Sequence, residues 1–73
     1  MEELTNMQYL CRGSKNQKRF AATVIDLAHS QGFYGRIMRD VNEMDEDEFN
    51  DLCNLIDKQD WHDSLDVVLW LEC

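Results

Sequence analysis

The chain has 73 residues and a formal net charge of −8 at pH 7, with 44% hydrophobic and 30% charged residues. Its length indicates one domain, residues 1–73, without room for a large enclosed substrate cavity. The hydrophobic content argues against a disordered chain, and no apolar run approaches the roughly 18–20 residues that span a membrane. The opening residues lack the features of a secretory signal, and the three cysteines are widely spaced, which together favour a reducing, cytoplasmic setting: Cys11, Cys53 and Cys73.

The charges are divided between the two halves of the chain. Residues 1–39 contain six basic and three acidic residues, whereas residues 40–73 contain twelve acidic residues and one lysine, Lys58. The second half therefore carries a formal charge of −11. A folded domain with this asymmetry presents a negative surface, which repels nucleic acid and attracts basic protein surfaces.

The apolar residues recur at three- and four-residue steps, and the chain has no proline and three glycines. These features predict an all-α fold, a bundle of four to five short helices. The first helix is expected over residues 5–12, with Thr5 and Gln8 as a capping box and Gly13 as a left-handed stop. The second should begin after Ser14, which forms a box with Gln17, and end near residue 31.

A third helix is expected over residues 33–43, directly after Gly32. The fourth has the clearest start, because Asp45 is its expected cap and Glu48 completes a capping box. Its apolar spacing turns Phe49 and Ile56 inward. The fifth helix, from residue 63 or 64 to 72, is apolar almost all round. This predicts that it is the central helix, or that a second chain covers part of it.

The carboxylates that follow residue 40 exceed what helix capping requires. Asp45 and Glu48 have capping roles, and the acids at 45–48 all complement the positive end of the helix dipole. Capping does not explain the other acids, which repel one another. Two interpretations stay open: a solvated helix face, or a docking surface that matches a basic groove or imitates nucleic acid. The candidate partner-binding residues on this side are Glu46, Asp47, Asp51, Asp57 and Asp60.

Residues 28–41 have a spacing that resembles the helix-turn-helix motif, with Ala28, Gly32, Phe33, Met38 and Val41 in its small, turn and hydrophobic positions. The resemblance implies that the recognition helix would open with Tyr34, Gly35, Arg36 and Arg39. The net charge argues against a DNA reader, and acidic residues lie four positions after each arginine, where they can pair with them: Asp40 and Glu43. The alternative is an ordinary helical hairpin.

For four aromatic residues the sequence suggests whether the side chain lies in the core or on the surface. Phe33 and Trp70 are expected in the core, whereas Tyr34 fits either the core or an interface. Trp61 lies in a polar loop, as an exposed anchor or as a lid over the core. An interface on the basic side would use Tyr34, Arg36 and Arg39.

No catalytic or metal-binding pattern is present in the sequence, so we expect no enzymatic activity, no metal and no cofactor. The expected function is binding of a protein with a basic, nucleic-acid-handling surface. Small acidic proteins of this character suit an inhibitor or adaptor, including those that phages and other mobile elements encode. The alternatives are a helix-turn-helix-like DNA-binding regulator using residues 20–43 and a structural homodimer.

Overall fold

The structure, a computed structural model, describes residues 4–72, so the opening three residues and Cys73 lie outside the described part of the chain. Within this part the chain forms five helices and no strand, which confirms the predicted all-α fold. The helices are α1 (Asn6–Cys11), α2 (Lys15–Ala28), α3 (Gly32–Glu43), α4 (Glu46–Asp57) and α5 (Ser64–Glu72). Across residues 4–72 no helix is both long and apolar enough to cross a membrane.

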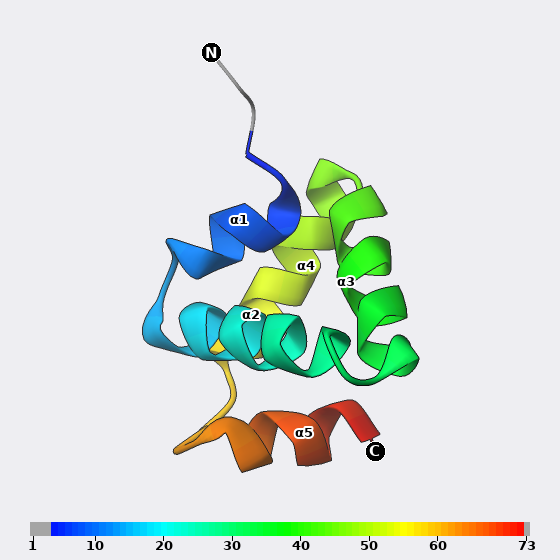
Figure 1. Cartoon of the computed structure of the whole chain (residues 1–73). Helices are drawn as coiled ribbons and strands as arrows, with labels where there is room; N and C mark the ends of the chain where they lie inside the picture. The colour runs from blue at the N-terminus through cyan, green and yellow to red at the C-terminus, as the bar shows by residue number, and fades with distance from the viewer. Residues whose placement is uncertain (1–3, 73) are drawn as a thin grey trace.

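The longest helix, α2, is the centre of the fold. It packs against each of the four other helices, and α1 also packs against α3 (Figure 1). The prediction of a central α5 is wrong, because α5 lies on one side of α2 and buries only Val67 completely. Two of its leucines stay largely exposed, Leu65 at 61% and Leu69 at 55%. A short helix at the edge of the bundle meets neighbours on one face, whatever its composition.

An aromatic cluster closes the core between α2 and α5. The ring of Trp61 stacks on Phe20 of α2 with centroids 6.3 Å apart, and Trp70 of α5 meets Trp61 edge-on at 5.3 Å. Trp61 is 7% exposed, so it is a lid over the core and not a surface anchor. The buried core consists of Met7, Leu10, Phe20, Ala21, Val24, Val41, Phe49, Ile56, Trp61 and Val67.

Local capping sets the helix starts. The capping boxes of α1 and α2 are formed as predicted, by Thr5 with Gln8 and by Ser14 with Gln17. Asp45 caps α4 by accepting a hydrogen bond from the backbone N–H of Glu48 at 2.9 Å. The return bond from the Glu48 side chain is not formed among the described residues, so this cap is half of the expected box.

Gly13 does not stop α1 through a left-handed conformation, because no glycine in residues 4–72 has a positive φ. Gly32 begins α3, and α2 ends at Ala28, three residues before the predicted end. A Cβ at position 13 would meet the amide end of the Gln17 side chain, so another residue there would displace the group that closes the cap of α2.

Two asparagines cap the ends of distant helices. The side-chain amide of Asn6 donates to the carbonyl oxygens of Val41 (2.7 Å) and Met44 (3.1 Å), at the end of α3. Asn16 donates in the same way to Ile56 (2.9 Å) and Gln59 (2.6 Å), at the end of α4. The carbonyl oxygens of Val41 and Ile56 also accept backbone N–H groups, from Met44 at 3.2 Å and from Gln59 at 3.1 Å, so each asparagine adds a second donor at a helix end and anchors α3 to α1 or α4 to α2.

Candidate functional site

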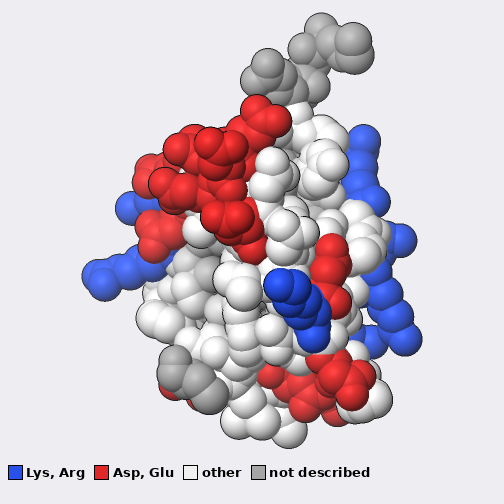
Figure 2. Space-filling view, turned by 180° about the vertical axis from the view of Figure 1, so that it is seen from behind, with Lys and Arg blue, Asp and Glu red and all other residues white. Residues whose placement is uncertain are grey.

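The outer side of α4 presents the candidate acidic residues to solvent. Phe49 and Ile56 are buried on the inner side of α4, whereas Glu46, Asp47 and Asp51 occupy other helical positions and are all exposed as predicted. In the view from behind, Asp and Glu side chains form a large patch over the start of α4 and a smaller one lower down (Figure 2).

These carboxylates have no cationic partner within the described chain. Across residues 4–72 no Lys or Arg nitrogen lies within 4.0 Å of a carboxylate oxygen. The ion pair found in this range joins His62 to Asp60 at 3.8 Å, and both side chains are more than four-fifths exposed. Repulsion among the acids of α4 is therefore not offset by close internal ion pairs, which leaves the patch free for an external cation.

The basic candidates lie on α3. Arg36 and Arg39 are exposed, and in the described residues neither forms the ion pair that Asp40 or Glu43 was expected to supply. They line a shallow surface depression together with Gly32, Gly35, Met38, Asn42 and Glu43. The structure therefore leaves two unpaired surfaces of opposite charge on two consecutive helices.

Tyr34 does not belong to this surface. Tyr34 is 1% exposed, so of its two expected placements the core is the one observed, whereas the adjacent Phe33 is 54% exposed and the prediction that it lies in the core is wrong. Burial, and after it the negative charge of Glu72, raises the pKa of the Tyr34 hydroxyl above its ordinary value. Tyr34 is removed from the candidate interface. The helix-turn-helix resemblance is weakened too, because Phe33 occupies a position that the motif buries.

Asp57 differs from the other candidate acids because α2 holds its carboxylate. The hydroxyl of Ser14 donates to one carboxylate oxygen, and the amide of Gln17 donates to the other at 3.0 Å. These bonds join the end of α4 to the start of α2, where a helix favours negative charge. Asp60 lies beyond α4 in the connecting loop, exposed and beside His62.

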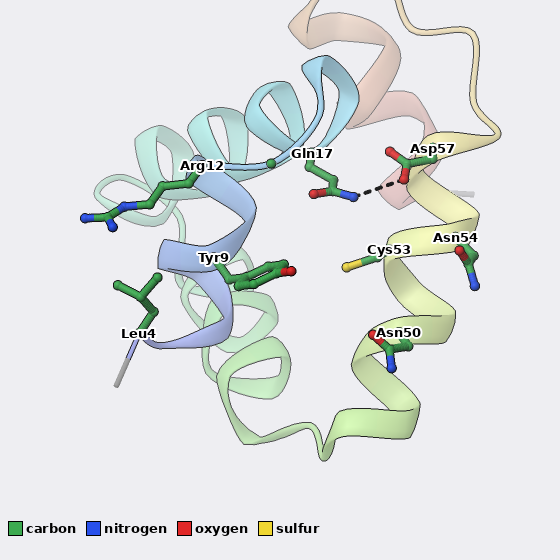
Figure 3. Close-up of a pocket in the computed structure, with 9 residues that line it drawn as sticks. Leu4, Tyr9, Arg12, Gln17, Asn50, Cys53, Asn54 and Asp57 are labelled. Carbon is green, nitrogen blue, oxygen red and sulfur yellow. Dashed lines mark hydrogen bonds between the residues drawn. The ribbon is translucent and has the colours of Figure 1, made fainter. Parts of the chain in front are cut away.

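A groove of about 710 Å³ runs between α1 and α4 (Figure 3). The ring of Tyr9 reaches from α1 toward the thiol of Cys53 on α4, while the side chain of Arg12 extends away from the groove. Asp57 and Gln17 close one end. The sequence patterns did not indicate this groove, because it depends on the contact between two helices that are distant along the chain.

The groove between α1 and α4 contains one thiol, that of Cys53, and the surroundings of this thiol do not activate it as a nucleophile. Burial, and after it the charge of Asp57, raises the pKa of the Cys53 thiol, which keeps the thiol protonated and a poor nucleophile at neutral pH. Among residues 4–72 no three His, Cys, Asp or Glu side chains are placed to hold a metal ion together. Comparisons of the chain with protein-family models, with curated proteins and with solved structures find no match.

Proposed function

We propose that the protein is a non-enzymatic binding module whose acidic α4 face docks on a basic surface of another protein. Its role would be that of an inhibitor or adaptor. The observation that carries this proposal is the exposure of Glu46, Asp47 and Asp51 without close internal cations. None of the three forms a hydrogen bond from its side chain in the described structure, although Glu46 and Asp47 lie in the first turn of α4, where a carboxylate favours the helix start.

The charge distribution also favours one kind of partner. A surface that normally binds nucleic acid carries lysines and arginines along the path of the phosphates. Clustered carboxylates on a helix can contact such a surface in place of the phosphates, with complementary potentials that speed the encounter. The proposed partner is therefore a protein that handles nucleic acid, and nucleic acid should compete with this module for it.

DNA binding by the module itself is the weaker alternative. Arg36 and Arg39 are exposed and unpaired in the described chain, which is the feature in its favour. The net charge of −8 opposes it, since an approaching duplex meets the repulsion of the whole domain. We expect no sub-micromolar binding to mixed-sequence or genomic duplexes in a gel-shift titration at physiological salt. Binding that depends on sequence and is lost in Arg36→Ala would establish the alternative.

Affinity capture from a lysate of the native host tests the proposal with three baits. The first bait is the wild type. The second is a triple variant that removes three negative charges, Glu46→Gln, Asp47→Asn and Asp51→Asn. The third is a double variant that removes two positive charges, Arg36→Gln and Arg39→Gln. We expect the wild type and the double variant to retain the same protein and the triple variant to lose it. Added nucleic acid should elute that protein.

The outcome against the proposal is equally specific. If the triple variant captures the same protein as the wild type, and nucleic acid does not displace it, the acidic face is only a solvated surface. Asp51→Asn should change stability by no more than about 0.5 kcal/mol, whereas Glu46→Gln and Asp47→Asn remove first-turn charges of α4 and should cost about 0.3–1 kcal/mol each. Circular dichroism melts of the three baits control for this.

A further inference from the structure

We propose that the groove between α1 and α4 receives an extended segment of a basic partner, with two arginines four residues apart. This inference rests on the proposed function, because it assigns a second recognition element beside the acidic face. It names Tyr9 and Asp57 as residues that contact the segment.

The wall that α4 contributes has an acidic residue at each end. Glu46, Asn50, Cys53 and Asp57 follow one another at four-, three- and four-residue steps, so they form one line along the helix. The groove near Asp57 and a smaller depression of about 290 Å³ near Glu46 are neighbours, because Leu4, Tyr9 and Asn50 line both of them. At 1.5 Å per residue, the positions of the two carboxylates lie about 16 Å apart along the helix axis.

The opposite wall supplies an aromatic surface. Tyr9 is 56% exposed, and its ring meets Phe49 edge-on with centroids 5.7 Å apart. This contact holds the ring across the groove and leaves ring surface open to a ligand. An arginine suits such a site better than a lysine, because its planar guanidinium stacks on an aromatic face and binds a carboxylate with two parallel hydrogen bonds.

The spacing favours an extended occupant over a helix. In an extended chain, residues i and i+4 point to the same side and lie about 13 Å apart, within reach of both carboxylates for two flexible arginines. In a helix the same two residues lie about 6 Å apart along the axis, too close together to reach both carboxylates.

Arg12 provides a variant that should increase the affinity for the segment. It lines the groove near Asp57, although its side chain extends outward in Figure 3. A fixed cation at this rim repels an incoming guanidinium, whereas Asp57 attracts it. Removal of the charge of Arg12 should therefore strengthen binding, and removal of the charge of Asp57 should weaken it.

The probe is the peptide acetyl-Gly-Arg-Ser-Gly-Ser-Arg-Gly-amide, titrated into the isotope-labelled full chain and followed by two-dimensional NMR. Its neutral control replaces both arginines by citrulline, which keeps the shape and removes the charge. We expect saturable shift changes at the amides of Tyr9, Asn50 and Cys53 with the arginine peptide, and none with the citrulline peptide.

The variants decide whether the groove or the general charge is responsible. Asp57→Asn should weaken binding about two- to fivefold, the size expected for one partly exposed charge pair. Asp26→Asn is the matched control, since it removes the same charge from an exposed position on α2, outside both the groove and the α4 face, and it should change affinity less. Arg12→Gln should strengthen binding. Because Asp57→Asn also disturbs the bonds to α2, Tyr9→Leu serves as a second weakening variant that leaves those bonds intact.

Three results would overturn the proposal: equal weakening by Asp26→Asn and Asp57→Asn, equal binding of the citrulline peptide, or unaltered binding by Tyr9→Leu. These results leave the proposed function standing if the triple variant of the α4 face still loses the captured protein. If the triple variant retains that protein, the proposed function fails independently of the peptide titration.

Discussion

Replacement of Asn16 by alanine should loosen the end of α4, the helix that carries the candidate site. The substitution removes both hydrogen bonds from the side-chain amide to the carbonyl oxygens of Ile56 and Gln59. A buried or partly buried hydrogen bond contributes about 1 kcal/mol net, so the free energy of unfolding should fall by about 2 kcal/mol. The bonds cross from α2 to α4. The carbonyl of Ile56 also accepts from the backbone N–H of Gln59 at 3.1 Å, whereas within residues 4–72 the carbonyl of Gln59 has no second donor.

The expected loss is large enough to measure by thermal unfolding. Domains of this size have an unfolding entropy of about 0.15 kcal/mol/K near 60 °C, so a loss of about 2 kcal/mol lowers Tm by about 13 °C. Asn54→Ala is the matched control, because Asn54 lies exposed on α4 and its side chain makes no hydrogen bond in the described structure. It should change stability by less than about 0.5 kcal/mol.

The reasoning fails if Asn16→Ala melts within about 3 °C of the wild type, a shift that corresponds to less than about 0.5 kcal/mol. Water would then satisfy both carbonyl groups as well as the asparagine does. Urea titrations of the same variants provide the second measurement, since an unchanged slope with a lower midpoint identifies a change in stability alone.

Further predictions concern α5 and the loop before it. Val67→Ala, at a fully buried position, should cost about 2 kcal/mol, whereas Leu69→Ala on the exposed side of the same helix should cost less than about 0.5 kcal/mol. Similar costs measured for the two in urea would show that α5 packs differently. Hydrogen bonds to Asp66, first from the backbone of His62 and then from that of Asp63, hold its pKa below the usual 3.8, although partial burial opposes them. A depressed pKa gives stability that is present above the unfolded value and is lost as pH falls through the folded value. The deficit of Asp66→Asn relative to wild type should therefore be largest near neutral pH and shrink in urea titrations below pH 3.8, and a deficit that does not change with pH would refute this assignment.

Local patterns predicted most of the helix starts. The cap at Ser14 and its partner Gln17 lie three residues apart, so their interaction is visible in the sequence and is formed in the structure. The orientation of Asp47 and Asp51 followed in the same way from the apolar spacing of α4. Both are interactions or directions within one helix, and helical geometry alone determines them.

What the sequence could not indicate depends on contacts between helices. The partners of Asn6 and Asn16 lie 35 to 43 residues away, and neither asparagine has a local signature of its role. The places of Phe33 and Tyr34 depend on how the first turn of α3 meets its neighbours. A shift of one residue in a helix turns a side chain by about 100°, which is enough to exchange an inner and an outer ring.

The groove also depends on contacts between helices that the sequence could not indicate. The sequence marked Asp57 as one acid among many, and only the packing of α1 beside α4 brings it into one surface with Tyr9. The composition of α5 likewise indicated burial but not which neighbours were available. Leu65 and Leu69 remain exposed because α5 meets the bundle on one side.

Association kinetics with the captured partner test the central claim most directly. Surface plasmon resonance at about 50 mM and 300 mM salt compares the wild type, the α4 triple variant and the Arg36 and Arg39 double variant. The Debye length is about 14 Å at the lower salt and about 6 Å at the higher, so long-range attraction is screened at the higher salt while direct contacts remain. We predict that the triple variant associates more slowly and with a weaker dependence on salt, while the double variant associates at least as fast as the wild type. The account is contradicted if the triple variant binds like the wild type and the double variant does not bind.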